Sequence, residues 1–176
     1  MRAGFFYASM MPSTNGRPAM AEPTKSIWFK EYRLEDLKAS SRSPGQASSG
    51  NMDSILGIEV VEVGPDFLKA RMPVSDRVRQ PLGIVHGGAN CVLAESIGSI
   101  ASWMSIDHEK FVALGLEINA NHLRPVRDGA VVAICRPIHK GRTTHVWDIR
   151  LHDEATGKLS CISRLTVQVV DRSKVT

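Results

Sequence analysis

The sequence predicts an α+β domain in which one long helix packs against about six antiparallel strands. The segment from Gly88 to Ile106 is apolar nearly all round, which is typical of a buried helix. Six other segments have β-like patterns, and the last ones alternate apolar and polar residues, as in an antiparallel sheet with one face in solvent. The simplest arrangement is a strongly curved sheet wrapped around the long helix.

Three parts are expected along the chain. Residues 1–25 are predicted to be a disordered extension, and the alternatives are a targeting segment in residues 1–20 or a translation start at Met20. Residues 26–50 are predicted to hold a short helix over Ser26–Ala39, followed by a linker rich in Ser, Gly and Pro. Residues 51–172 form the compact domain. The short helix rests on a partial apolar stripe of Ile27, Tyr32, Leu34 and Leu37.

Two strands open the domain, at Ile55–Val63 and Phe67–Val74, joined by a Gly-Pro-Asp turn. A loop through Arg77–Val85 leads to the long helix. Gly98 lies inside that helix and costs roughly 1 kcal/mol of helix propensity relative to alanine. Its presence indicates that the sheet approaches the helix closely there.

Four more strands are predicted at Phe111–Leu123, Ala130–Ile138, Thr144–His152 and Leu159–Val170. Alternate residues of the last two form apolar faces: Trp147, Ile149 and Leu151 in one, and Cys161, Leu165, Val167 and Val169 in the other. The strand from Ala130 is apolar on both faces, which predicts a central strand or an interface.

The composition narrows the class of function. The net charge of +4 comes from 22 basic and 18 acidic residues without a long basic run, and the aromatic content of 6% offers little for base stacking. We therefore expect an anionic small ligand and no nucleic acid. No apolar run is long enough to span a bilayer, so no membrane association is expected.

Cysteine and histidine spacing excludes two further kinds of site. Cys91, Cys135 and Cys161 are odd in number and far apart, which favours reduced thiols in a cytoplasmic protein. The six histidines form no compact ligand motif, so no metal is expected.

Glu95 is the candidate catalytic residue. It is an acid among small and apolar residues of the long helix, and a carboxylate is costly to bury. Ser99 follows one helical turn later and can hydrogen-bond the carboxylate or hold a water beside it. The alternative is an exposed acid on a solvated strip, the usual place of a helical glutamate.

The start of the same helix offers hydrogen-bond donors. Gly87 and Gly88 lie where backbone N–H groups lack intrahelical acceptors, and the helix dipole adds partial positive charge. With the side chains of Gln80 and His86, these groups could form an oxyanion hole for an acyl group. Alternatively, the glycines only begin a helix, the histidine is satisfied locally, and the glutamine lies on the surface.

Together these residues resemble the hotdog-fold acyl-CoA thioesterases, in the branch with the phenylacetate-pathway, enterobactin-proofreading and dihydroxynaphthoyl-CoA enzymes. The matching blocks are QPLGIVHGGANCVLAESIGS, GLEINANHLRPV, IHKGRTTHVWDI and CISRLTV, in the family's order, and the resemblance covers roughly Ile27 to Val170. It implies the hotdog fold for the predicted helix and sheet.

The resemblance also implies a role for each matching residue. Glu95 would act as nucleophile or as general base, Ser99 would position water or the carboxylate, and the N–H of Gly87 would bind the thioester oxygen. Gln80 and His86 would assist. The residues that would contact the substrate and coenzyme A are Gly115, His122, Arg124, His139, Gly141, Arg142, Thr143 and Thr144.

The expected function is therefore hydrolysis of aryl- or medium-chain acyl-CoA, with no cofactor because coenzyme A belongs to the substrate. The resemblance implies a homodimer with shared active sites and a tetramer of two dimers. A non-catalytic acyl-CoA-binding module and a hotdog dehydratase or hydratase are the alternatives. Asn90 and Cys91 depart from the family's usual residues and leave the acyl group open.

Overall fold

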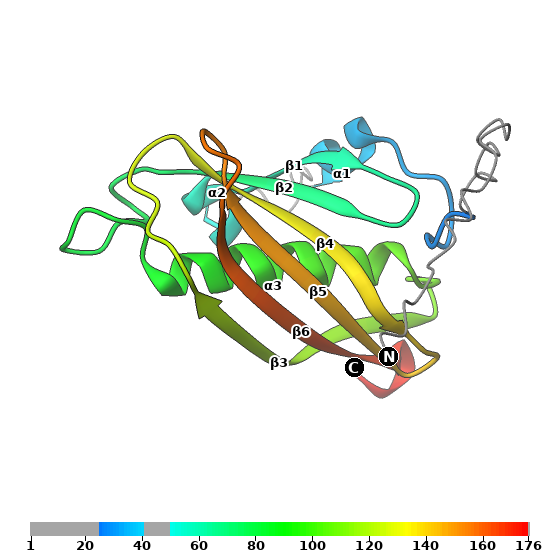
Figure 1. Ribbon diagram of the computed structural model, residues 1–176. Helices are drawn as coiled ribbons and strands as arrows, with labels where there is room; N and C mark the ends of the chain where they lie inside the picture. Colours follow the sequence, from blue (N-terminus) through cyan, green and yellow to red (C-terminus); the bar gives the residue numbers. More distant parts are fainter. Residues whose placement is uncertain (1–24, 41–49, 176) are drawn as a thin grey trace, which may run out of the picture.

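The computed structural model describes residues 25–40 and 50–175. Two short helices, α1 (Leu34–Ser40) and α2 (Met52–Leu56), precede strands β1 (Glu59–Val63) and β2 (Leu68–Pro73). The long helix α3 covers Gly87–Met104. The remaining strands are β3 (Phe111–His122), β4 (Ala130–Lys140), β5 (Thr144–Asp153) and β6 (Leu159–Asp171), before a 3-10 turn at Arg172–Lys174 (Figure 1).

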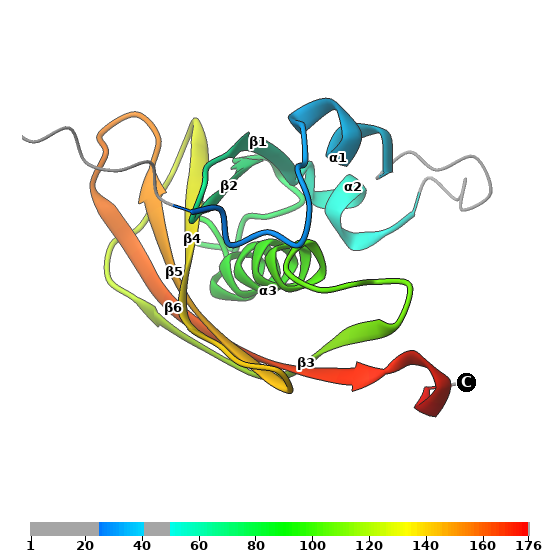
Figure 2. The same cartoon turned by 90° about the vertical axis from the view of Figure 1, so that its right-hand side faces the viewer.

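The six strands form one antiparallel sheet in the order β1-β2-β4-β5-β6-β3. The sheet curves around α3, which lies in its concave face (Figure 2). The predicted α+β class and hotdog arrangement are therefore confirmed. Strand β4 lies between β2 and β5, as its apolar pattern predicts, and β1 and β3 are the two edges.

Helix α3 packs closely on the sheet because one of its residues lacks a side chain. A Cβ atom added to Gly98 would lie 2.5 Å from Leu165 Cδ2 and 3.2 Å from Ile149 Cδ1. A larger residue would push the helix away from the sheet. Nearby, the indole N–H of Trp147 donates to Ser102 Oγ over 2.7 Å in the interior. The close approach predicted from Gly98 is confirmed.

The apolar faces predicted for the last two strands are also confirmed. In β5 and β6 the inward residues alternate with more exposed ones, as the two-residue period of a strand requires. The buried members are Trp147, Ile149, Leu151, Cys161, Leu165, Val167 and Val169. These side chains form the sheet's half of the core, against α3.

The predicted helix over Ser26–Ala39 is wrong in its first half, because α1 begins only at Leu34. The preceding residues bond to distant parts of the domain instead. The indole N–H of Trp28 donates to the carbonyl of Gly64 at 2.7 Å, and the backbone N–H of Phe29 donates to Met104 at 2.8 Å. These tertiary hydrogen bonds replace those of a helix.

Helix α2 was not predicted, and the strand expected from Ile55 begins only at Glu59. The capping residues explain this helix. Asn51 Oδ1 accepts from the Ser54 N–H at 2.8 Å, and Gly57 ends the helix with a left-handed φ of 70°. The predicted extension and most of the predicted linker lie outside the described residues.

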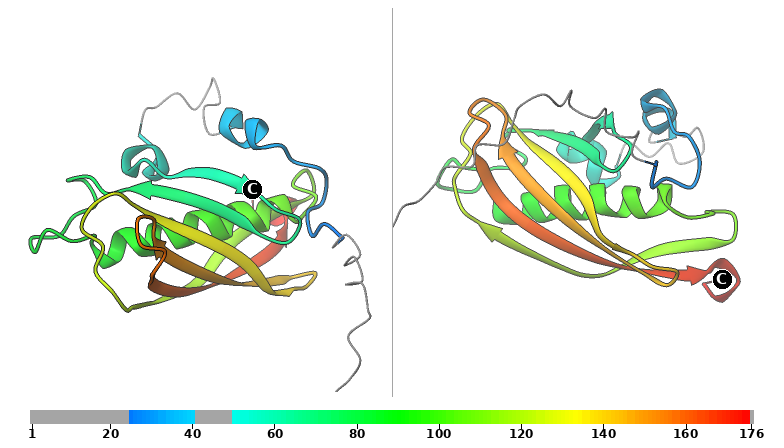
Figure 3. Two further views of the ribbon diagram at one scale, coloured as in Figure 1. Left: turned by 45° about the horizontal axis from the view of Figure 1, so that its top comes forward. Right: turned by 45° about the vertical axis from the view of Figure 1, so that its right-hand side comes forward.

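Figure 3 shows α1 and α2 together on the side of α3 that the curved sheet leaves open. Both helices therefore help to enclose space beside α3. In the described part of the chain, no helix combines the length and the apolar character needed to cross a membrane.

Candidate active site

Glu95 lies in the middle of α3 and is half-buried. Ser99 donates from Oγ to Glu95 Oε1 at 3.2 Å, the contact that the one-turn spacing predicts. Burial raises the pKa of Glu95, and the hydrogen bond from Ser99 partly opposes that rise. A carboxylate with a raised pKa is a stronger base than an ordinary one, which suits proton abstraction.

Strand β3 makes room for this carboxylate at a glycine. A Cβ atom on Gly115 would lie only 2.4 Å from Glu95 Oε1, so a side chain there would displace the carboxylate. The β3–β6 register is irregular between Gly115 and Glu117, next to the same point. The structure therefore brings Glu95, Ser99 and Gly115 together.

The start of α3 is organised by His86. Its Nδ1 accepts from the Gly88 N–H at 2.8 Å, so the histidine caps the helix. Gly87 is the first helical residue, whose N–H has no acceptor within the helix. His122 Nε2, at the end of β3, lies 2.7 Å from where a Gly87 Cβ would be. A side chain at Gly87 would require the His122 ring to move.

A tight turn places Gln80 beside the same helix start. The N–H of Gln80 donates to Ile84 at 2.9 Å, and the N–H of Gly83 donates back to Gln80 at 2.8 Å. Gly83 has a φ of 72°, which glycine adopts without strain. Arg79 and Val85 form a bridge across the base of the turn.

A cavity of about 330 Å³ opens at this end of α3, and we call it the polar cavity because Gln80, Asn90, His122 and Arg124 are on its wall. Its lining brings together four of the predicted site residues, whereas His86 does not line it. The lining consists of Gln80, Ile84, Val85, Gly87, Asn90, His122, Leu123, Arg124, Pro125 and Val126. Asn90 is only 7% exposed, and its Oδ1 is buried without a hydrogen-bond partner in the described part of the chain.

The predicted coenzyme A loop lies elsewhere. The N–H of Gly141 donates to the Thr144 carbonyl at 2.9 Å, and a Gly141 Cβ would lie 2.6 Å from His139 Nε2. Arg142 and Thr143 are exposed at the tip. The strand register puts this loop near the beginning of β3, whereas His122 ends β3. One chain does not bring the loop and the polar cavity together.

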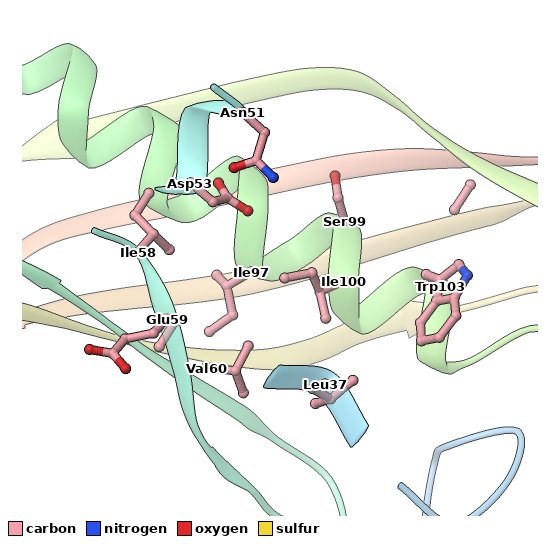
Figure 4. Close-up of a pocket in the computed structure, with 12 residues that line it drawn as sticks. Leu37, Asn51, Asp53, Ile58, Glu59, Val60, Ile97, Ser99, Ile100 and Trp103 are labelled. Atoms are coloured by element: carbon pink, nitrogen blue, oxygen red, sulfur yellow. The ribbon is translucent and has the colours of Figure 1, made fainter. Parts of the chain in front are cut away.

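A larger apolar cavity, of about 500 Å³, has Ser99 on its wall. The sequence did not predict this cavity. Figure 4 shows its wall of branched side chains from α3 and β1, with Trp103 at one end. The lining residues are Leu37, Asn51, Asp53, Ile58, Glu59, Val60, Ala70, Ile97, Ser99, Ile100, Trp103 and Ala113. The capping residues Asn51 and Gly57 could have predicted helix α2, which forms part of this wall.

The acid and the helix-start donors are separated within one chain. Gly87 and Glu95 are eight residues apart on α3, which is about 12 Å along the axis of an α-helix. A single carbonyl group cannot contact both. The chemical groups needed for acyl transfer are therefore present, but in two places on one copy of the chain.

Comparison with known proteins places these features in a family. The model of the thioesterase superfamily matches residues 82–160, from the turn after Gln80 to the beginning of β6. The 1,4-dihydroxy-2-naphthoyl-CoA hydrolase of Escherichia coli is 45% identical over 144 residues, covering 82% of this chain and 99% of that protein. The proofreading thioesterase EntH of Cronobacter turicensis is 40% identical, covering 82% and 98%.

Solved structures agree with the sequence relatives. The crystal structure of a mutant thioesterase from Pseudomonas aeruginosa has a TM-score of 0.76 at 47% identity, covering 83% of this chain and 99% of that one. Zebra fish thioesterase superfamily member 2 has a TM-score of 0.68 at 23% identity, covering 78% and 99%. At that identity the second comparison shows a shared fold alone.

Proposed function

This chain belongs to the thioesterase superfamily, and from that premise we propose how it hydrolyses its substrate. The chain is an enzyme, an acyl-CoA thioesterase that releases a free acid and coenzyme A. We further propose aryl- or medium-chain acyl groups as its substrates and Glu95 as the group that drives the reaction. No cofactor is required, since water is the only other reactant.

The observation that carries this proposal is the setting of Glu95. Its carboxylate is half-buried, bonded to Ser99, and pressed against a strand where any side chain would collide with it. Among residues 25–40 and 50–175 this half-buried carboxylate forms no ion pair, so burying it lowers the stability of the fold. It is a good base or nucleophile, because it needs little reorganisation to react.

Two routes fit this geometry. As a nucleophile, Glu95 attacks the thioester carbon, the C–S bond breaks, and coenzyme A leaves while a mixed anhydride awaits water. As a general base, Glu95 takes a proton from a water that attacks the same carbon, the C–S bond then breaks, and the proton passes to the leaving thiolate of coenzyme A. In both routes the N–H of Gly87 and the amide of Gln80 stabilise the negative oxygen.

A second copy of the chain would complete the site. Strand β3 is a twelve-residue edge strand, and Leu114 and Leu116 beside Gly115 are 41% and 59% exposed. A long edge with exposed apolar residues is suited to pairing with another strand. Antiparallel pairing of two β3 strands would direct Glu95 of one chain toward the partner's Gly87 and Gln80. We propose this homodimer, and a tetramer of two such dimers.

The same pairing would bring the His139–Thr144 loop of one chain toward the polar cavity of its partner, because the two lie at opposite ends of β3. Arg142 at the loop tip and Arg124 at the cavity could then bind phosphates of coenzyme A. The free thiols of Cys91, Cys135 and Cys161 support a reducing, cytoplasmic setting for this enzyme.

The apolar cavity is the proposed acyl site. Its volume of about 500 Å³ is in the range of small-molecule pockets, and Ser99 lies on its wall next to Glu95. An acyl chain or an aromatic ring there would replace water against isoleucine, valine and tryptophan side chains. The thioester carbonyl would remain outside, close to the carboxylate.

The direct test replaces Glu95 by glutamine and measures thiol release from a panel of acyl-CoAs. We expect kcat to fall by roughly 10²- to 10⁴-fold, with folding and oligomeric state unchanged. Glu109→Gln is the matched control, because Glu109 is an exposed acid that lines neither cavity. Turnover like that of the wild type in Glu95→Gln would overturn the assignment. Trapping an acyl-enzyme in a single turnover would distinguish nucleophile from base.

A further inference from the structure

The apolar cavity has one polar side that thioester hydrolysis does not use. Figure 4 shows Asn51 and Asp53 next to each other at the top of the view, above Ile58, Ile97 and Val60. Both polar residues come from the start of α2. An acyl group in this cavity would therefore have Asn51 and Asp53 on one side and mainly hydrocarbon on the others, where Glu59 and Ser99 are the remaining polar side chains.

Asp53 is held in place from α3. Ser96, the residue after Glu95, donates from Oγ to Asp53 Oδ1 at 2.5 Å. In residues 25–40 and 50–175 the Asp53 carboxylate forms no ion pair, and its Oδ2 has no hydrogen-bond donor. One oxygen is thus oriented by the protein, and the other is available to a ligand.

The neighbouring polar groups are less suited to this task. Asn51 already uses its Oδ1 to accept from the Ser54 N–H at 2.8 Å, and this cap keeps α2 folded. Glu59 is exposed on the edge strand β1, where water solvates it. Asp53 is the carboxylate that is both fixed and partly withdrawn from solvent.

We propose that Asp53 is a specificity-determining residue that selects acyl groups bearing a hydroxyl. This inference rests on the proposed function, because it takes the apolar cavity as the acyl site. An ionised carboxylate only accepts hydrogen bonds, so a hydroxyl on the acyl group would give it the donor it lacks. An unsubstituted acyl group would displace water from the carboxylate without giving it a new hydrogen-bond donor.

A hydroxyl fits better than a cation. The other walls carry Ile58, Ile97 and Ile100, with Trp103 at one end, so an ammonium group would lose most of its hydration there. Removing both ions from water can cost as much as their attraction returns. A neutral hydroxyl has a much smaller desolvation cost and still forms a charge-assisted hydrogen bond.

The test compares kcat/KM for benzoyl-CoA, the three hydroxybenzoyl-CoA isomers and their methoxy analogues. The methoxy group keeps the oxygen but has no hydrogen to donate. In the wild type, at least one hydroxybenzoyl-CoA should exceed both benzoyl-CoA and its methoxy analogue. In Asp53→Leu this preference should fall by about ten- to a hundredfold, as expected for a hydrogen bond to a charged group, while benzoyl-CoA is still hydrolysed.

Two further variants separate recognition from folding. Ser96→Ala keeps the carboxylate but removes its orienting hydrogen bond, so the preference should fall partly. Asp53→Asn keeps the size of the side chain and should also lower the preference if Asp53→Leu does not fold. Glu109→Gln, at an exposed acid that lines neither cavity, is the control and should keep the wild-type ratio.

Three results would overturn the role of Asp53. One is an unchanged hydroxyl preference in Asp53→Leu, or in Asp53→Asn if the leucine variant does not fold. Another is an equal loss on all substrates, which would show a structural role. The third is a stronger preference for aminomethylbenzoyl-CoA, which would assign the cavity to a cation. If the wild type hydrolysed straight-chain acyl-CoAs but no aryl-CoA, the aryl part of the proposed function would fail instead.

Discussion

The two cavities beside α3 differ in what they can do. The apolar cavity lies by Ser99 in the middle of the helix, where Ile97 and Ile100 provide hydrocarbon. The polar cavity lies at the first turn, where Gln80 and His122 surround backbone N–H groups. In the proposed function, one would hold the acyl group and the other would stabilise the developing negative charge. Since both belong to one rigid helix, a single chain keeps them apart.

The helix itself produces part of this difference. At its start, unsatisfied N–H groups and the helix dipole favour an anion beside Gly87. In its middle there are no such groups, so burial acts on Glu95 in the opposite sense and raises its pKa. In the homodimer that we propose, the two sites would complement each other, with an oxyanion hole from one chain and a base from the other.

The largest expected effect comes from mixing two inactive variants. Glu95→Gln removes the acid, and Gln80→Ala removes a donor at the other cavity, with an expected loss of about 10²- to 10³-fold. In a random mixture of co-expressed chains, about half of the dimers are hybrids, and each hybrid has one intact site of two. Thiol release should then recover to about a quarter of the wild-type rate if sites are shared as the edge-strand pairing implies. No recovery would mean that each chain contains its own complete site.

A side chain at Gly115 should disturb Glu95 and leave the polar cavity unchanged. The Cβ of Gly115→Ala would lie 2.4 Å from Glu95 Oε1, so the carboxylate must move. A displacement of about 1 Å at a reacting group can lower turnover by about 100-fold, and we expect a loss of 10- to 100-fold in kcat. Gly50→Ala is the control, because nothing lies within 4 Å of its Cβ. The same loss in both variants would refute a local effect.

Ser99→Ala should shift the pH profile of turnover. The Ser99 hydrogen bond favours the charged carboxylate and lowers the pKa of Glu95, so its loss raises that pKa further. The acidic limb of kcat/KM should therefore move to higher pH, together with a roughly three- to tenfold loss at neutral pH. Steady-state rates across a pH series would measure both. An acidic limb that stays in place would mean that another group controls it.

The smallest effect should appear in stability. Burial raises the pKa of Glu95, so folding is opposed once this carboxyl ionises, above its ordinary pKa. Glu95→Gln should therefore unfold at a slightly higher temperature than the wild type at neutral pH, and the gap should close as pH falls through the pKa of Glu95. Thermal unfolding at several pH values would show whether the variant is more or less stable than the wild type. A variant that is less stable at neutral pH would show that the carboxylate stabilises the fold.

Most of the fold could be predicted because local pattern and tertiary structure agree. The alternation around Trp147 and Leu165 survives in the structure, since one face of each strand covers α3. The exceptions are segments whose partners are distant in sequence. Trp28 and Phe29 lie in the segment that was predicted to be helical, but they bond to Gly64 and Met104 instead. No local pattern contains those partners.

The candidate site divides in the same way. The spacing of Glu95 and Ser99 on one helix predicted their contact, because positions four apart share a face. The resemblance implied separate roles for Glu95 and Gly115, and it did not predict that the two residues lie in contact. Asp53 was missed altogether, because its partner Ser96 is 43 residues away and the helix that carries it has five residues.

The sequence by itself determined the elements, the buried faces and the acid among apolar residues, because periodicity and the cost of burying charge are local properties. The tertiary structure decided distances between residues far apart in the chain. It placed Glu95 against the edge strand β3, separated it from Gln80 and the polar cavity, and enclosed an acyl-sized cavity under α2. The physical reason is that a curved sheet brings its strands around one helix, and only that closure sets which side chains meet.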